Sequence, residues 1–221
     1  MMNKREFKNR VYDELARLTK ALANPHRLEI IELLAQGDYA VEQISAQTGL
    51  SIANASQHLQ VLKAARLVDV TRNGKFVHYR LANANVFKVW RALRELGVEQ
   101  IASIDKLVKD FRQSKTKSEA ITVDELTKRI ESGKVTILDV RPESEYKKGH
   151  IANALSIPFD ELASRLKELP KRNEIIAYCR GPFCVFADEA VYLLNKAGYK
   201  ATRLDQGFPD WALIGKPVHI N

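Results

Sequence analysis

The first half of the chain carries apolar residues at helical spacing, separated by short turns. The first such run recurs every three or four residues, at Tyr12, Leu15, Leu18 and Leu22. Pro25 fits the first turn of the next predicted helix, which stops at Gly37. A short third helix follows. After the turn at Gly49, a fourth helix is predicted from its N-cap Ser51 to about Ala65.

The next segment, LVDVTRNGKFVHYRL, predicts two strands around Asn73-Gly74. Asn-Gly tolerates the positive φ angles that a tight two-residue hairpin requires. A long amphipathic helix is then predicted from Ala84 to about Phe111, with Gly97 as a candidate bend. The positions that we expect it to bury are Val86, Phe87, Trp90, Leu93, Leu96, Ile101, Ile104 and Leu107.

The second half alternates apolar strands with helices. Strands are predicted at 135–140, 154–157, 174–179 and about 200–204, and helices at 122–131, 159–169 and 185–197. This alternation predicts a parallel sheet covered on both faces. The run RQSKTKSEA is polar and lacks apolar periodicity, which indicates a linker. We therefore divide the chain into a mainly α domain at 1–113, a linker at 114–120 and an α/β domain at 121–221.

Two short helices joined by a tight turn and followed by a two-stranded wing make a winged helix-turn-helix. The second helix of such a pair fits the major groove of DNA. We expect it to contact base edges with Asn54, Ser56, Gln57 and His58. Since this helix carries almost no formal charge, we expect phosphate contacts to supply the affinity. The candidate phosphate contacts are Lys63, Arg66, Arg72, Lys75 and Arg80.

The distribution of charge supports a nucleic-acid partner for the first half. The chain has a formal net charge of +8. Residues 1–115 hold 19 Lys and Arg against 12 Asp and Glu, a net of +7, and residues 116–221 hold 16 against 15, a net of +1. This asymmetry is typical of a DNA-binding domain joined to a neutral domain, although a solvated basic surface would look the same.

Two cysteines, Cys179 and Cys184, are too few for a disulfide framework, and the nearby sequence offers no further ligands for zinc. We expect no metal and no cofactor, and we interpret the pair as thiol chemistry. No run of 18 apolar residues and no apolar signal core appears, so we expect a cytoplasmic protein without membrane contact.

The segments ALANPHRLEIIELLAQG and QISAQTGLSIANASQHLQVLKAARLVDVTRNGKFVHYRL resemble the ArsR family of bacterial repressors, over about Ala21 to Leu81. The resemblance implies a homodimer, built through the first and last helices of the domain, that binds an inverted-repeat DNA operator and is released by an inducer. The metal-sensing cysteine pair of some members is absent from GDYAVEQIS. No histidine lies between Val86 and Phe111, where a second known metal site of the family lies. We expect His58 to face DNA or solvent rather than to bind a metal.

Cys179 follows an apolar strand, and the loop RGPFC leads from it to a helix. Loop N–H groups and a helix N-terminus stabilise an anion, so we expect a favoured thiolate at Cys179, with Arg180 adding positive charge. A thiolate there can take a sulfane sulfur and hold it as a persulfide. Taken alone, Cys179 would be interpreted as a small buried apolar residue at a strand end, and it is the agreement of the flanking segments that favours sulfur chemistry.

Three segments together resemble rhodaneses over about Ile121 to Val218: ILDVRPESEYKKGHIANALSIP, the Cys179 loop and DQGFPDW. The resemblance implies a sulfurtransferase-type domain with Cys179 as the sulfur carrier and Arg180, Gly181 and Cys184 in its loop. Asp139 and Arg141 match an acidic and a basic position of the family, and we expect Arg141 to pair with Glu145.

The length of the loop separates two chemistries. A phosphatase loop of the type C-x5-R would place Arg at position 185, where this chain has Val185. The family associates the six-residue loop from Cys179 to Cys184 with sulfur. Cys184 departs from the family, which commonly has a basic residue or Thr there. It either resolves a Cys179 persulfide into a disulfide with release of sulfide, or points into the sheet as a structural residue.

The sequence thus predicts a transcriptional regulator whose rhodanese domain carries or senses sulfane sulfur on Cys179. The donor would be thiosulfate, a persulfide or a polysulfide. Two alternatives stay open. One is a working sulfurtransferase that the winged helix localises to DNA, and the other is a silent rhodanese domain that serves as an interaction module.

Overall fold

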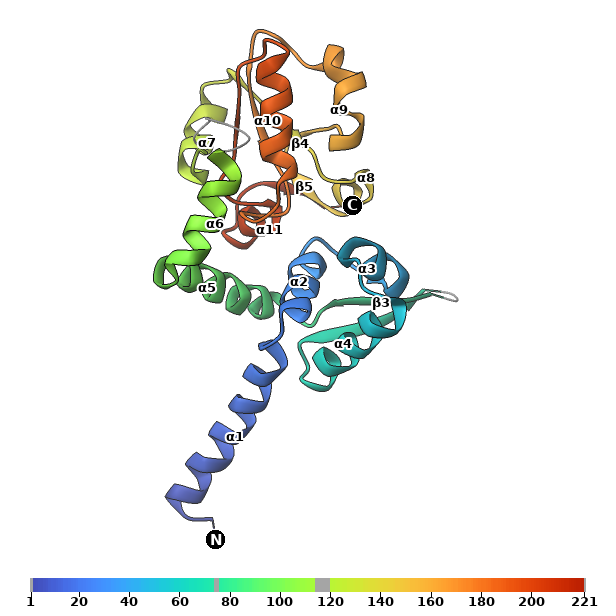
Figure 1. Cartoon of the computed structure of the whole chain (residues 1–221), viewed down its shortest axis with the longest axis vertical. Coiled ribbons are helices and arrows are strands. Elements are labelled where there is room, and N and C mark those ends of the chain that lie inside the picture. The colour runs from blue at the N-terminus through green and yellow to red at the C-terminus, as the bar shows by residue number, and fades with distance from the viewer. Residues whose placement is uncertain (1, 74–75, 114–119, 221) are drawn as a thin grey trace. The chain divides into compact units, whose positions relative to one another are not determined.

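The computed structural model describes residues 2–73, 76–113 and 120–220, and its chain forms two compact units, Met1–Trp90 and Arg91–Asn221 (Figure 1). The helices of the first unit are α1 (Lys4–Leu22), α2 (Pro25–Leu34), α3 (Val41–Thr48), α4 (Ile52–Ala64) and the start of α5 (Ala84–Gln100). Its strands are β1 (Tyr39–Ala40), β2 (Val68–Asn73) and β3 (Phe76–Leu81), in the antiparallel order β1-β3-β2.

Local sequence explains the helix-turn-helix of this unit. Gly49 ends α3 with φ +69°, a left-handed conformation that glycine adopts without a Cβ clash. The hydroxyl of Ser51 accepts a hydrogen bond from the backbone N–H of Asn54 at 3.2 Å, which confirms Ser51 as the N-cap of α4. Strand β2 continues through Asn73, and Gly74, the second residue of the predicted turn, lies outside the described residues.

The apolar core of the first unit lies between its helices and the small sheet. Its most deeply buried side chains are Ile30, Ile31, Ile44, Ala55, Leu59 and Leu62, none of which has measurable exposure. These residues come from α2, α3 and α4, and the wing strands β2 and β3 add the buried Val68 and Tyr79. The sequence-predicted winged helix-turn-helix is confirmed.

The long helix predicted from Ala84 to Phe111 is two helices, α5 and α6 (Ala102–Gln113), with a break at Ile101. Val86, Phe87 and Trp90 are buried as predicted. The predicted burial of four further positions is wrong within this single chain, because Leu93, Leu96, Ile101 and Leu107 are 42%, 55%, 49% and 70% exposed. The periodicity identified an apolar face but not what covers it.

The second unit holds a parallel sheet, as predicted. The order of its four main strands in space is β6 (Leu155–Ser156), β4 (Val135–Asp139), β7 (Glu174–Tyr178) and β8 (Ala201–Arg203). A small antiparallel pair joins β5 (His150–Ile151) to β9 (Val218–His219). The helices are α6, α7 (Val123–Glu131), α8 (Glu143–Lys148), α9 (Phe159–Arg165), the 3-10 turn η1 (Leu166–Glu168), α10 (Phe186–Lys196) and α11 (Phe208–Leu213).

Helices cover the sheet on both faces, and each face has its own apolar core. Ile175, Ala177 and Cys179 belong to the cluster packed with α9 and α10. Ile176 and Tyr178 belong to the cluster packed with α7 and α11. This alternation is the period of two expected for a strand buried on both sides. It sets which face the Cys179 side chain occupies.

The predicted domain boundaries stay a prediction, because residues 114–119 of the expected linker lie outside the described part of the chain. The compact units divide the chain at 90/91, within α5, so α6 belongs with the rhodanese-like half. Among the residues that the structure describes, no helix is long and apolar enough to cross a membrane.

Candidate functional site

Cys179 lies directly after β7, at the carboxyl end of a central strand of the parallel sheet. Ligand sites of open α/β sheets form at this edge. The Cys179 side chain is 3% exposed and continues the apolar face that packs against α10. The Cys179 sulfur therefore lies inside the loop and not on an open surface.

The loop from Arg180 to Val185 folds over Cys179. The backbone N–H of Cys184 donates to the carbonyl of Gly181 at 3.1 Å and closes a turn within the loop. The Cys179 Sγ lies 3.5 Å from the carbonyl oxygen of Cys184 and 3.9 Å from that of Gly181. The structure thus brings together Cys179, Gly181 and Cys184 as the sequence predicted.

The two thiols affect each other's ionisation. Burial raises the pKa of Cys179 well above its usual range, and the hydrogen bond with Cys184 adds to this. Backbone hydrogen bonds from Ala187 and Gly181 act in the opposite direction. The hydrogen bond from Cys179 lowers the pKa of Cys184. The pKa of Cys179 thus departs from our prediction of a favoured thiolate there, because desolvation outweighs the loop N–H groups.

Arg180 is turned away from the thiols toward α8. Its Nε donates to the Glu145 carboxylate at 3.0 and 3.2 Å, and its Nη2 lies 2.5 Å from Oε1. The Arg180 side chain is 17% exposed and that of Glu145 is 1% exposed. Arg180 thus anchors the first residue of the loop to α8, a geometric role beside the electrostatic one that we expected.

The segment DQGFPDW packs against the backbone of the loop at Arg180 and Gly181. A Cβ on Gly207 would lie 2.1 Å from the carbonyl oxygen of Arg180 and 2.5 Å from the backbone nitrogen of Gly181. Only glycine allows the two backbones to approach this closely. The Phe208 N–H donates to the Cys179 carbonyl at 3.2 Å, so this segment fixes the backbone of Cys179 itself.

A buried polar network lies beneath the loop, in the strands of the sheet. The Arg141 Nη2 is 2.6 Å from Asp139 Oδ2, and the Tyr178 hydroxyl donates to the same oxygen at 2.5 Å. We predicted that Arg141 would pair with Glu145. The structure shows Asp139 as a close partner of Arg141 and Arg180 as a partner of Glu145, and the charge of Glu145 also raises the pKa of Arg141. This network is structural support for the carboxyl ends of β4 and β7.

Two arginines that sequence reasoning missed reach this region from the helices before the predicted linker. Arg94 on α5 lies 2.7 Å from Asp210, and Arg112 on α6 donates to the carbonyl of Pro182 in the loop. These partners are 116 and 70 positions away along the chain. No local pattern marks such pairs, because helical periodicity shows only that these residues are polar.

The side chains of α4 that we expect to contact DNA differ in their exposure to solvent. Asn54, Gln57 and Lys63 are exposed, and Ser56 and His58 are half-buried. Burial, then the charges of His26 and Arg27, lower the pKa of His58, whose ring lies 5.5 Å from that of His26. His58 is therefore neutral near pH 7 and available as a hydrogen-bonding group.

The basic residues of the wing region lie on its surface where the structure describes them. Arg66, Arg72 and Arg80 are exposed, and Lys75 lies outside the described residues. Among the residues described, no group of three or more His, Cys, Asp and Glu side chains is arranged to hold a metal ion.

Comparisons with known proteins match both halves. Residues 24–70 match the family of bacterial regulatory proteins described as the arsR family, and residues 122–213 match the rhodanese-like domain. The HTH-type transcriptional regulator Rv0324 of Mycobacterium tuberculosis is 43% identical over 218 residues, which are 99% of this chain and 96% of that protein.

Shorter relatives match the first half alone. The biofilm growth-associated repressor of Xylella fastidiosa is 34% identical over 89 residues, 40% of this chain and 78% of the repressor. A solution structure of a homodimeric winged helix-turn-helix DNA-binding domain from Mycobacterium bovis is 39% identical. It covers 46% of this chain and 94% of its own, with a TM-score of 0.43.

Proposed function

The chain belongs to the arsR family of bacterial regulatory proteins, in the form that carries a C-terminal rhodanese-like domain, and we propose that it regulates transcription according to the sulfur state of Cys179. The observation that carries the proposal is that Cys179 and Cys184 share one short loop at the end of β7, where the Cys179 Sγ lies 3.5 Å from the Cys184 carbonyl oxygen and Cys184 packs against the same apolar cluster. A loop with a single buried thiol would serve packing equally well. A second thiol in contact with it favours sulfur chemistry.

The first step is uptake of sulfur by Cys179. The Cys184 thiolate accepts the proton of Cys179 through their hydrogen bond, and the Cys179 thiolate attacks the sulfane sulfur of a donor R–S–SH. The S–S bond of the donor breaks as the Cys179–S–SH bond forms. The leaving R–S⁻ takes the proton held by Cys184. The step leaves a Cys179 persulfide, R–SH and the Cys184 thiolate, and it needs no oxidant.

The second step uses Cys184 as a resolving thiol. Its thiolate attacks the sulfur bonded to the Cβ of Cys179, a Cys179–Cys184 disulfide forms, and HS⁻ leaves. The two cysteine sulfurs are oxidised by two electrons, and the outer sulfur is reduced to sulfide. Only a short loop has to close. The same thiolate is half-buried against the apolar cluster of Cys179, which also suits a structural residue.

DNA binding belongs to the first unit in this proposal. The exposed Asn54 and Gln57, with Ser56 and His58, would contact base edges in the major groove, and Lys63, Arg66, Arg72, Lys75 and Arg80 would contact phosphates. Support for this assignment comes from the confirmed N-cap of α4 and the accessibility of its polar side chains.

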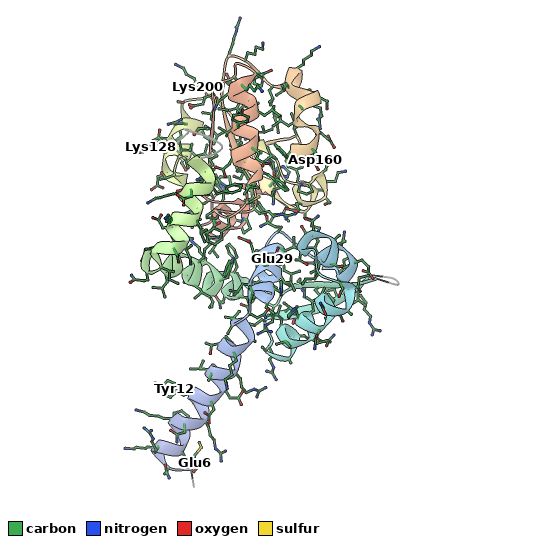
Figure 2. The ribbon with its side chains drawn as sticks, viewed as in Figure 1. Glu6, Tyr12, Glu29, Lys128, Asp160 and Lys200 are labelled. Carbon is green, nitrogen blue, oxygen red and sulfur yellow. The ribbon has the colours of Figure 1, made fainter. Side chains whose placement is uncertain are left out.

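A homodimer would cover the apolar faces that the single chain leaves in solvent. On α1, Phe7, Tyr12 and Leu15 are 54%, 67% and 53% exposed. Figure 2 shows the Tyr12 side chain projecting from this helix. On α5, Leu93 and Leu96 are 42% and 55% exposed. Exposed apolar residues on the first and last helices of the domain match the dimer that the family resemblance implies.

Mass spectrometry after treatment with inorganic polysulfide tests the sulfur chemistry. Wild-type protein should gain the mass of one sulfur on Cys179, and part of it should carry a Cys179–Cys184 disulfide. Cys184→Ser should accumulate the persulfide, and Cys179→Ser should gain no sulfur in the loop. Loading without any effect on DNA affinity, together with turnover of a sulfane donor, would favour the rival function of a sulfurtransferase localised to DNA.

A further inference from the structure

Helix α6 precedes the predicted linker, yet its last turn contacts the loop from Arg180 to Val185, which we call the sulfur loop. The Arg112 guanidinium donates through Nη2 to the carbonyl of Pro182, which lies in the middle of the loop. Its Nε lies 3.6 Å from Asp188 Oδ1 in the first turn of α10. One side chain therefore holds both the loop and the helix that follows the loop.

The surroundings of Arg112 make this contact sensitive to charge. Its side chain is 24% exposed, while that of Asp188 is 2% exposed. Arg203 on β8 shares the same carboxylate, with Nε 2.9 Å from Asp188 Oδ1. Burial, then the charge of Arg203, lower the pKa of Arg112, while Asp188 and the sulfur of Cys179 raise it. A change of charge on Cys179 thus acts directly on Arg112.

A second contact links α5 to the back of the loop. The Arg94 Nη2 lies 2.7 Å from Asp210 Oδ1, with side chains 4% and 0% exposed. The other oxygen of Asp210 accepts the N–H of Gly207 at 3.2 Å. Gly207 in turn packs against the Arg180 backbone, with no room for a Cβ. A continuous series of contacts therefore joins Arg180 through Gly207 and Asp210 to Arg94.

Helices α5 and α6 follow one another with a single residue, Ile101, between them. The first residues of α5, with buried Val86, Phe87 and Trp90, belong to the compact unit of the winged helix. The residues from Arg91 onward belong to the unit of the sulfur loop. The helix that carries Arg94 is thus shared by the DNA-binding unit and the sulfur-carrying unit.

We propose that Arg112 is a positioning residue of the sulfur loop and that, together with Arg94, it transmits the sulfur state of Cys179 to helices α5 and α6. The inference rests on the proposed sulfur chemistry of Cys179. A persulfide places one more sulfur atom and a negative charge inside the loop whose Pro182 carbonyl Arg112 binds. A disulfide removes the charge and pulls Cys184 toward Cys179. The contacts of Arg112 consequently differ in free energy among the states, which is the requirement for coupling to DNA affinity.

The test compares four full-length proteins: wild type, Arg112→Gln, Arg112→Lys and the control Lys106→Gln. Lys106 is an exposed cation on the same helix. The DNA probe is a duplex selected from a random-sequence pool by reduced wild-type protein. For each protein, the Kd for this duplex is measured in the reduced form and after loading with inorganic polysulfide, and loading is verified by mass. The pH dependence of the alkylation of Cys179 by iodoacetamide is measured on the reduced proteins by peptide mapping.

For wild type and Lys106→Gln, loading should change the Kd about tenfold, which lies within the usual range of coupled sites. Arg112→Gln should still gain sulfur, but its loaded and reduced Kd values should differ less than about twofold. In this variant the pH profile for alkylation of Cys179 should move to higher pH, because a cation that favours the Cys179 thiolate is lost. Arg112→Lys keeps the cation and should keep the wild-type profile. A merely structural role would not reproduce this dependence on charge.

Three results would overturn the inference. If Arg112→Gln keeps both the wild-type ratio of Kd values and the wild-type pH profile, Arg112 does not transmit the state of the loop, and the proposed function stands. If the loaded and reduced Kd values of Lys106→Gln become as similar as those of Arg112→Gln, the effect is due to the net charge of α6. A wild-type protein that gains sulfur without any change in Kd would refute the proposed regulation and the inference together.

Discussion

The guanidinium of Arg180 binds the carboxylate of Glu145, with Nη2 and Oε1 2.5 Å apart. Because Glu145 is 1% exposed, the first residue of the sulfur loop is fixed to the interior of the domain by a charge pair. The loop is consequently held at its start by Arg180 and at its centre by Arg112, and its backbone packs against Gly207. A loop supported at three places keeps the two thiols in contact.

Breaking the Arg180–Glu145 pair should destabilise the rhodanese-like half. Glu145→Gln leaves a largely buried guanidinium without its counter-charge, which costs about 3–5 kcal/mol in comparable pairs. Urea unfolding of the full chain, followed by a probe in that half, measures the change. Glu143→Gln, at an exposed position of the same helix, should leave the transition unchanged. Equal unfolding midpoints for the two variants would contradict the anchoring role.

Gly207 should tolerate no side chain. A Cβ there meets the Arg180 carbonyl, and backbone atoms must shift to accommodate it. Gly207→Ala should therefore lose about 1–3 kcal/mol of stability and should gain less sulfur from polysulfide than wild type. The control is Gly97→Ala, where the nearest atom is the flexible end of Ile104 at 3.4 Å and a helix former replaces glycine. Wild-type loading and stability in Gly207→Ala would contradict this account.

Cys184 should ionise before Cys179. Its pKa is lowered by the hydrogen bond from Cys179, while burial raises that of Cys179. A lowered pKa means that thiolate appears at lower pH, so iodoacetamide should label Cys184 at a lower pH than Cys179. In Cys179→Ala this hydrogen bond is lost, and the labelling midpoint of Cys184 should move upward. Peptide mapping over a pH series distinguishes the two sites, and earlier labelling of Cys179 would contradict the assignment.

Binding to DNA should depend steeply on salt, and two classes of substitution should behave differently. Arg72→Ala should weaken binding to all sequences and lower the slope of log K against log salt by about one unit. Gln57→Ala should instead relax the preference at particular base pairs, by about 1–3 kcal/mol for a bidentate contact. Lys4→Ala, on α1 and away from the helix-turn-helix, is the control. Fluorescence anisotropy with matched and mismatched duplexes measures both effects, and a slope unchanged by Arg72→Ala would contradict the phosphate contact.

The sequence predicted the features that local patterns control. Ser51 caps α4 because its hydroxyl reaches a backbone N–H three residues later, and Cys179 ends an apolar strand because that strand is buried on both faces. Leu96 and Leu107 were expected to be buried and are exposed, since periodicity reports an apolar face and not its cover. Residue types and spacing directly indicate helix caps, strands and apolar faces.

Contacts between distant segments could not be predicted in this way. Arg94 and Arg112 read as ordinary polar positions of an amphipathic helix, while their partners lie in another region of the sequence. The direction in which the pKa of Cys179 shifts was predicted wrongly for a related reason. Loop N–H groups are visible in the sequence pattern, but the burial of Cys179 depends on how α10 packs against the sheet.

The most direct test of the account is the affinity of the full-length protein for its selected duplex in different sulfur states. The Kd is measured for reduced, polysulfide-loaded and subsequently dithiothreitol-treated wild type, with Cys179→Ser carried through the same steps. The account predicts that loading changes the Kd of wild type about tenfold, or ~1.4 kcal/mol, that dithiothreitol reverses the change, and that Cys179→Ser shows none. Equal Kd values for reduced and fully loaded wild type would contradict regulation through Cys179.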